Sequence, residues 1–216
     1  MLSEDVIERN KQEFLSILEK AVTSREGANW EGLKKKLESS DFFTAPASTK
    51  FHSCFKGGLC LHSLITYDNM KNLVQVKGFG EIIPEDTIAI VALLHDMSKI
   101  NNYTITSRNK KVYSESGSKF DELGRFDWVA EQAYAVLPDE ERFLYGNHEE
   151  TSEYMVRTFI PLRYEESIAI LHHHGGQGFD SCQNQVASKI MGRYPLTTFL
   201  HLSDMMAVYI DENLLV

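Results

Sequence analysis

The stretch Val91–Ile100, with the sequence VALLHDMSKI, places two adjacent metal-type ligands, His95 and Asp96, at the end of an apolar, helix-like run. Neighbouring residues of a regular helix point about 100° apart, so both side chains can reach one cation only where the backbone is irregular. Ser98 and the polar residues after Ile100 favour a helix terminus here. Imidazole and carboxylate groups together are typical ligands of borderline and hard divalent metals. The segment therefore predicts a helix that ends in a metal site.

Other candidate ligands lie at helix-like positions elsewhere in the chain: His62, His148, the run His172-His173-His174, and Asp204. Facing helices of a bundle commonly build metal sites by projecting such side chains toward one point. His62 and Asp204, together with the His95-Asp96 pair, would hold one ion. His148 and His173 would add a second ion, with Asp96 as the natural bridge between the two.

Asp204 competes with Asp211 for the last ligand position. Apolar residues surround Asp204, whereas Asp211 neighbours Glu212 near a polar end of the helix. A buried carboxylate needs a partner and a cation provides one, so Asp204 is preferred. His201, one turn before Asp204, is interpreted as a structural residue.

Three further side chains are candidate substrate contacts: His52, Lys99 and Arg108. The ammonium of Lys99 either stabilises a helix C-terminus or holds a phosphate beside the metals, and its fixed spacing from Asp96 favours the second reading. Asp96 and Lys99 are therefore the expected catalytic residues. His52 precedes the Gly57-Gly58 turn and either reaches the site entrance or is a structural residue. Arg108 belongs to a polar segment that is either a lid over the site or a plain surface excursion.

Length and charge restrict the partners. The chain has 216 residues and a formal charge of −9, which fits a single core and disfavours a long nucleic acid. A small phosphorylated substrate, above all a nucleotide, is compatible because bound cations offset the charge locally. No apolar stretch approaches the roughly 20 residues that span a bilayer, and no signal peptide is recognisable. Three cysteines without CxxC spacing favour reduced thiols and therefore a cytoplasmic protein. The sequence is compatible with a monomer or an oligomer.

Apolar periodicity predicts an all-α bundle with one small inserted β-hairpin. Helices are expected over residues 4–22, 29–38, 57–76, 84–95, 125–137, 148–159, 164–173 and 196–212. Residues 103–113 alternate apolar and polar side chains around 108–110, which predicts a two-stranded hairpin with a polar tip. The helices of residues 1–45 are expected to pack on a core formed by 46–216, as one structural unit.

Five segments give the chain a resemblance to the HD-domain metal-dependent phosphohydrolases, and together they span about residues 46–210. They are Gly57–Ser63, Leu94–Ile100, Gly146–Glu150, Ala169–Gly175 and Leu202–Asp204. Pro46 and His52, ahead of the Gly-Gly turn, look especially like the HD-type 3′–5′ exoribonucleases and related uncharacterised bacterial or phage hydrolases. The chain departs from the family at Met97-Ser98, where many relatives carry Ile-Gly or Leu-Gly.

The resemblance implies an HD-domain helical bundle with His62, His95, Asp96 and Asp204 as metal ligands. It also implies a second ion held through His148 and one histidine of the run 172–174. The family pattern, in which one residue separates the ligand from glycine, selects His173, with His172 and His174 left open. One or two divalent ions are implied, with Mn²⁺, Mg²⁺, Ni²⁺ and Fe²⁺ as the alternatives.

The expected function is therefore a metal-dependent phosphohydrolase acting on a nucleotide or on a small phosphate ester or diester. Three alternatives stay open. They are a 3′–5′ exonuclease on short single-stranded nucleic acid, a mixed-valent di-iron oxygenase with the same ligand geometry, and a non-catalytic nucleotide sensor.

Overall fold

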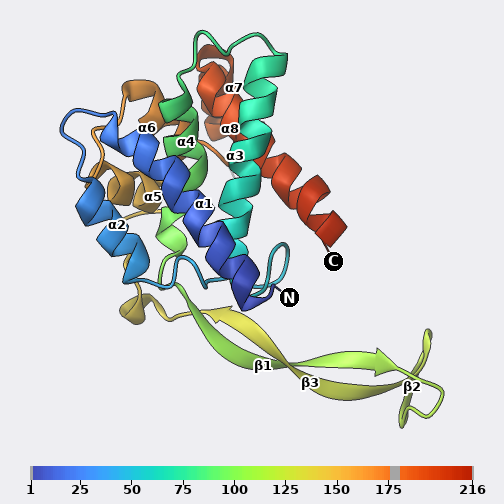
Figure 1. Cartoon of the computed structure of the whole chain (residues 1–216). Coiled ribbons are helices and arrows are strands. Elements are labelled where there is room, and N and C mark those ends of the chain that lie inside the picture. Colours follow the sequence, from blue (N-terminus) through green and yellow to red (C-terminus); the bar gives the residue numbers. More distant parts are fainter. Residues whose placement is uncertain (1, 176–180, 216) are drawn as a thin grey trace.

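A computed structural model describes residues 2–175 and 181–215, and its architecture is mostly helical with one small antiparallel sheet (Figure 1). The α-helices of the described residues are α1 (Glu4–Thr23), α2 (Trp30–Glu38), α3 (Gly58–Val76), α4 (Glu85–Leu94), α5 (His148–Arg157), α6 (Tyr164–Leu171), α7 (Ser181–Arg193) and α8 (Pro195–Met206). The strands are β1 (Tyr103–Tyr113), β2 (Lys119–Asp121) and β3 (Gly124–Val136), in the order β1-β3-β2. The expected mostly helical architecture is confirmed, but the sheet makes "all-α" too narrow a description.

Helix α4 is the centre of the bundle. Every residue from Thr87 to Leu94 is buried, as expected of a helix that is apolar on all sides. Helices α1 and α3 lie beside it (Figure 1), and α6 also contacts it. The side chains of Phe14, Met70 and Leu93 are among those fully removed from solvent in this core. Because α4 runs through the interior, the residues that follow Leu94 are delivered to a buried position.

The turn before α3 requires glycine. Gly57 has a φ of +84°, a left-handed conformation that glycine adopts without strain. A Cβ on Gly58 would lie 2.1 Å from the carbonyl oxygen of Ser53. The segment that precedes α3 therefore packs directly against the start of that helix, and this places His52 near the first turns of α3.

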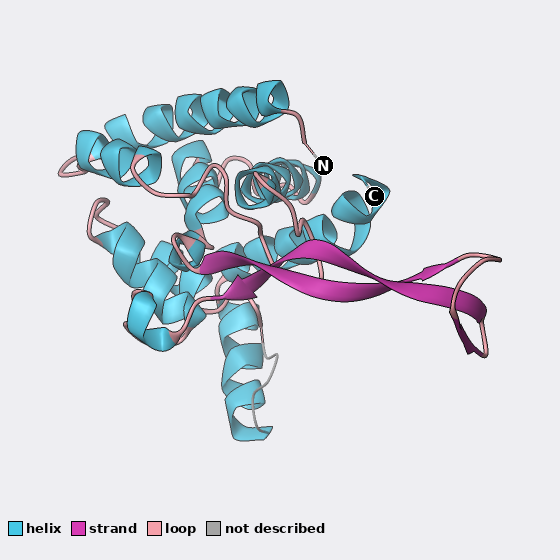
Figure 2. Ribbon diagram, turned by 90° about the horizontal axis from the view of Figure 1, so that it is seen from below, coloured by secondary structure: helices cyan, strands magenta, loops and turns pink. Residues whose placement is uncertain are grey.

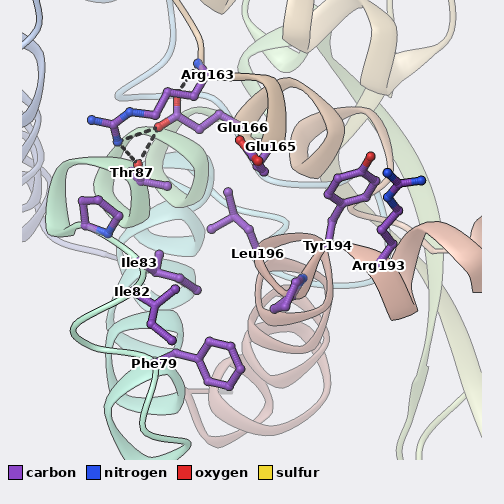
Figure 3. A pocket seen from close by; sticks show the side chains of 12 residues that line it. Phe79, Ile82, Ile83, Thr87, Arg163, Glu165, Glu166, Arg193, Tyr194 and Leu196 are labelled. Atoms are coloured by element: carbon purple, nitrogen blue, oxygen red, sulfur yellow. Dashed lines mark hydrogen bonds and ion pairs between the residues drawn. The ribbon is translucent and has the colours of Figure 1, made fainter.

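An ion-pair network joins α1, α4 and α6. Arg25 donates to Asp86 Oδ2 at 2.5 Å and to Glu166 Oε2 at 2.9 Å, and Thr87 donates to Glu166 Oε1 at 2.6 Å. Arg163 completes the network beside Thr87 and Glu166 (Figure 3). The side chains of Arg25 and Glu166 are 8% and 0% exposed, so these charges depend on one another for compensation.

The helix expected over 125–137 is wrong, because this segment forms the strand β3. Its apolar residues satisfy both periods, because Phe126, Ala130, Ala133 and Val136 lie close to helical spacing while the even-numbered positions alternate as in a strand. The chain follows the strand period, and β3 pairs with β1 along its whole length, from Tyr103 opposite Val136 to Tyr113 opposite Phe126.

The expected hairpin within 103–113 is also wrong. These residues form a single strand, and the chain reverses only between Tyr113 and Gly124, where β2 adds a short third strand. Figure 2 shows that the resulting ribbon extends well beyond the helices. The turn was predicted from the polar residues at the centre of 103–113, but a polar centre also fits an exposed strand. Only the pairing with β3 distinguishes the two.

Two differences concern the C-terminal part. Helix α7 was not expected, and the helix predicted over 196–212 ends as α8 at Met206. A π-helical turn, Ala207–Asp211, and a 3₁₀ turn, Glu212–Leu215, follow it. None of the helices in the described ranges combines the length and apolarity that crossing a bilayer demands.

The Arg25 network predicts a large stability loss on truncation. We expect Arg25→Ala to lower the free energy of unfolding by about 3 kcal/mol, because it leaves Glu166 buried without its partner. The control Lys71→Ala removes an exposed pair with Glu85 and should cost less than about 1 kcal/mol. Urea unfolding measures both, and equal losses for the two variants would contradict the assignment.

Candidate metal centre

The six candidate ligands come from five separate segments that meet at one end of α4. His62 lies in α3, His95 and Asp96 follow α4, His148 begins α5, His173 follows α6, and Asp204 lies in α8. All but His148 are buried, with side chains of His62, Asp96 and His173 no more than 2% exposed. So many buried polar groups in one place require mutual compensation or a bound ion.

The end of α4 explains how adjacent residues face one point. His95 still has helical backbone angles, but Asp96, at φ −101° and ψ 22°, leaves the helix and leads into a 3₁₀ turn, Met97–Lys99. His95 Nε2 thereby lies 3.5 Å from Asp96 Oδ2. The irregular helix terminus expected from the sequence is present.

The first group of ligands surrounds His62 Nε2. This atom lies 3.2 Å from Asp204 Oδ1, 3.3 Å from His95 Nε2 and 3.5 Å from Asp96 Oδ2. The other three ligand atoms, from the end of α4 and from α8, therefore lie within 3.5 Å of His62 Nε2. His62, His95 and Asp96 form one group of potential ligands, and Asp204 forms an overlapping group with His95 and His173.

The second group faces the other oxygen of Asp96. His148 Nε2 lies 2.7 Å from Asp96 Oδ1 and His173 Nε2 lies 3.8 Å from it. His174 joins His148 and His173 in a further cluster of potential ligands, and its own Nδ1 pairs with Glu149 at 2.8 Å. Asp96 thus presents Oδ2 to one group and Oδ1 to the other, which is the arrangement needed for a bridging carboxylate.

Each of the four imidazoles is oriented by its other nitrogen. Nδ1 of His95 contacts the carbonyl oxygen of Ala92 at 2.9 Å, and Nδ1 of His173 contacts that of Ile170 at 2.7 Å. A carbonyl oxygen only accepts, so both Nδ1 atoms donate and the neutral rings carry lone pairs on Nε2. His148 Nδ1 lies 2.6 Å from the hydroxyl of Ser98. Metal-ligating histidines are typically anchored in this way.

Glu212 orients the fourth imidazole. Its Oε1 lies 2.6 Å from His62 Nδ1, and its Oε2 lies 3.2 Å from His52 Nδ1. Sequence reasoning missed Glu212 because it follows the π-helical turn, where helical periodicity no longer predicts direction. His52 therefore lies beside the site, with its ring centroid 4.9 Å from that of His62.

One atom of the cluster has no partner among the described residues. His173 Nε2 is buried and makes no hydrogen bond, although it is aimed at Asp96. A buried lone pair without a donor is costly, and a cation on this side of Asp96 would satisfy it. The donor set of imidazole nitrogens and carboxylate oxygens fits Mn²⁺, Fe²⁺ and Ni²⁺, and its carboxylates also suit Mg²⁺, whereas a soft ion such as Cu⁺ prefers thiolates.

Burial and neighbouring charges shift the pKa values of the cluster, and the direction differs from one group to the next. Burial raises the pKa of Asp96, but Lys99, His95 and His148 outweigh it and hold that pKa well below its usual range. Burial lowers the pKa of His95 to about 4 and also that of His173, so both rings are neutral at pH 7. Burial opposes the protonation of His62, yet hydrogen bonds to Asp204 and Glu212 raise its pKa to about 9. In the metal-free protein a proton on His62 therefore holds the carboxylates together.

A cavity of about 380 Å³ opens over the cluster. Besides Asp96 and Asp204, its lining contains four nitrogen-bearing side chains that can contact a bound molecule: His52, Lys99, His174 and His201. Of the predicted substrate contacts, His52 and Lys99 therefore lie at this cavity. Lys99 Nζ lies 2.6 Å from Asp96 Oδ2. A larger cavity of about 510 Å³, lined by Phe79, Ile83 and Leu196 among others, shares no residue with the cluster (Figure 3).

The structure does not bring Arg108 to this site. Arg108 lies in the middle of β1 on the protruding ribbon, and its Nε donates to Glu131 of β3 at 2.9 Å. The ribbon extends away from the helices, so Arg108 is not placed as a substrate contact and 103–113 is not a closed lid (Figure 2). His172 lies outside the groups of potential ligands among the described residues. His201 donates from Nδ1 to the carbonyl oxygen of His173 at 2.6 Å, and it also lines the cavity over the cluster.

Comparison with known proteins yields no relative, since no family model, no curated protein and no solved structure matches the chain.

The contact between Glu212 and His62 predicts that a substitution of Glu212, which is not itself a proposed ligand, weakens metal binding. We expect Glu212→Gln to weaken Mn²⁺ binding about 10–100-fold, because the amide no longer fixes the Nδ1–H tautomer of His62. Asp211→Asn is the matched control, since Asp211 accepts from Asn69 and does not touch the cluster. Isothermal titration calorimetry measures both affinities, and identical affinities would contradict this function of Glu212.

The raised pKa of His62 predicts the pH dependence of metal binding. Because that pKa is about 9 in the metal-free protein, a cation must displace a proton from His62 at pH 7. Affinity should therefore rise about tenfold per pH unit from pH 7 to near pH 9 and then level off, with about one proton released at pH 7. Calorimetry in buffers of different ionisation enthalpy counts that proton, and a flat profile over this range would contradict the prediction.

Proposed function

We propose that this chain is a divalent-metal-dependent phosphohydrolase of the HD type, which acts on a nucleotide or on a small phosphate ester or diester. The observation that carries the proposal is the orientation of four imidazoles, each anchored through Nδ1, with their Nε2 atoms gathered around the two oxygens of Asp96. The resemblance of five sequence segments to HD-domain enzymes supports the same conclusion. We also propose a cytoplasmic location.

The residues divide into two ligand sets. His62, His95 and Asp204, with Oδ2 of Asp96, would hold one ion. His148 and His173, with Oδ1 of Asp96, would hold the other, and His174 is near enough to join them. Bound divalent ions supply Lewis acidity and a nucleophilic hydroxide near neutral pH.

Lys99 is the positioning cation of the proposed reaction. Its ammonium compensates Asp96, which stays ionised and so remains able to orient a water molecule for attack on phosphorus. Lys99 also lines the cavity with His52, His174 and His201, so four nitrogen-bearing side chains border the space where phosphoryl oxygens would lie. Fixed donors of this kind stabilise the charge that develops on those oxygens in the transition state.

The cavity also has an aromatic rim that favours a nucleoside. Phe51 and Tyr209 both line it, although their side chains are 87% and 62% exposed. Exposed rings beside a polar cavity offer stacking surfaces for a base, each worth about 1–3 kcal/mol in single-stranded nucleic-acid sites. The volume of about 380 Å³ suits a mononucleotide-sized molecule better than a long strand.

Two substitutions separate metal binding from turnover. We expect Asp96→Asn to abolish both, because it removes the anionic group that faces both ligand sets. Lys99→Ala should keep Mn²⁺ affinity within about threefold while lowering kcat/KM by about 10–100-fold, through the loss of phosphate stabilisation. Lys71→Ala, on the surface of α3, is the control and should change neither.

The assay is a panel of nucleotides, phosphomonoesters, cyclic dinucleotides and short single-stranded RNA, with Mn²⁺, Mg²⁺, Ni²⁺ and, under argon, Fe²⁺. Hydrolysis without oxygen, lost in Asp96→Asn, would support the proposal. Tight nucleotide binding without hydrolysis under every metal, or turnover that requires oxygen, would refute it.

A further inference from the structure

The two faces of the β1–β3 ribbon differ in composition. Directly opposed residues of antiparallel strands point to the same face, so the register separates two sets. One set, named here the aromatic face, contains Tyr103, Ile105, Tyr113, Phe126, Trp128, Tyr134 and Val136 at its two ends. Its centre is small and polar, with Ser107, Asn109, Ala130 and Gln132. The opposite face carries Arg108, Lys110 and Glu131 in ion pairs.

The outer end of the aromatic face forms a convex cluster, named here the knob: Tyr113, Phe126 and Trp128. Phe126 lies 5.6 Å from Tyr113 and 5.7 Å from Trp128 between ring centroids, and Lys111 covers Phe126 at 4.4 Å. Phe126 is buried by these neighbours, whereas Trp128 stays 47% exposed. A tryptophan held in place at the end of a projecting ribbon is a typical binding anchor.

The inner end of the same face borders a cavity of about 410 Å³, named here the base cavity. Tyr103, Ile105 and Tyr134 form one wall, and residues 41–56 that precede α3 form the other, with Pro46 and Phe55 among them. Tyr103 donates to the carbonyl oxygen of Ala47 at 3.4 Å, which ties the two walls together. Ile105 is 63% exposed in this position. The aromatic face therefore carries an aromatic cluster at one end and, at the other, a cavity whose largely apolar lining also includes Asp41 and Lys56.

The two ends lie at equal distances along the strands from one central pair. Ile105 and Tyr113 lie four residues on either side of Asn109, and Tyr134 and Phe126 lie four residues on either side of Ala130, the register partner of Asn109. In a face-to-face dimer, a two-fold axis that runs between the two copies and crosses the strands at the Asn109–Ala130 pair would place the knob of each copy over the base cavity of the other. The two contacts would lie roughly 27 Å apart along the strands. Ala130 leaves room for close approach at that axis.

We propose that the aromatic face binds a second copy of this chain, with the two ribbons antiparallel and each knob in the partner's base cavity. Charge favours a second copy over a polyanion, because residues 103–136 contain five basic and five acidic side chains and carry no net charge in a chain of −9. The same charge favours the antiparallel arrangement, since a parallel one would bring two acidic helical bodies together at the same end.

The exposure of the ribbon also favours a partner on this face. A two-stranded ribbon has little independent stability in water, yet β1 and β3 pair over 11 residues with most side chains of β1 exposed. One face of this length buries on the order of 600 Å² per chain, which lies at the lower end of specific interfaces and implies a micromolar dimer.

Sedimentation velocity from about 1 to 100 μM, a range chosen for micromolar dimers, tests the proposal on the full chain. We expect a monomer–dimer equilibrium that Trp128→Glu and Ile105→Glu each weaken at least tenfold. Val129→Glu is the matched control, because Val129 adjoins Trp128 with 48% exposure but points to the opposite face, and it should leave dimerisation unchanged.

Cysteine cross-linking tests the axis separately. Asn109→Cys should give a disulfide-linked dimer under mild oxidation, whereas Lys110→Cys, on the opposite face, should not exceed the unsubstituted chain. A monomer at every concentration would overturn the proposal. A dimer that is insensitive to Trp128→Glu, or equally sensitive to Val129→Glu, would overturn it too, and would assign the contact to another surface or the ribbon to another partner.

Discussion

The compensation of the buried Asp96 carboxylate is the interaction on which the rest of the structure depends. Helix α4 is apolar on every side, so it must lie in the middle of the bundle, and its end delivers Asp96 to the interior. A buried charge is tolerated only with close partners. Lys99 and His148, at 2.6 and 2.7 Å, and the more distant His62, His95 and His173 are those partners. The helices α3, α5 and α6 carry or precede His62, His148 and His173, so their positions around the end of α4 meet this requirement.

The outer contacts of the imidazoles explain why the cluster suits a cation rather than a simple ion-pair network. His95 and His173 each donate from Nδ1 to a backbone carbonyl, so each neutral ring carries its lone pair on Nε2, toward the cluster. The lowered pKa values of both rings keep them neutral. Neutral rings cannot compensate Asp96 and Asp204. The raised pKa of His62, held between Asp204 and Glu212, favours its protonated form, and the ammonium of Lys99 adds a second positive charge beside Asp96. Two aspartates and Glu212 gather three carboxylates around these groups, and a divalent ion would compensate them further.

The sequence predicts those parts of the molecule that depend on local pattern. The apolar run before His95 is long enough to indicate a central helix, and Asn147 with Glu150 predicts where α5 begins through a capping box. Glu212 could not be found this way, because its direction depends on the π-helical turn after Met206 and on the distance from α3. The strand β3 could not be distinguished from a helix, because its neighbours in space, β1 and β2, decide between two periods that the residues satisfy about equally.

The ribbon and the candidate metal centre share one segment of chain. Residues 46–56 contribute Phe51 and His52 to the cavity over the cluster, and Pro46 and Phe55 to the base cavity beneath the ribbon. His52 is tied to the cluster through Glu212, and the close approach of Gly58 to Ser53 fixes the segment against α3. On the proposed assembly, a partner's knob would pack against the same short segment that carries the aromatic rim of the cavity. Ordering this segment at one end restricts it at the other, so the dimer contact and the substrate cavity would be energetically coupled.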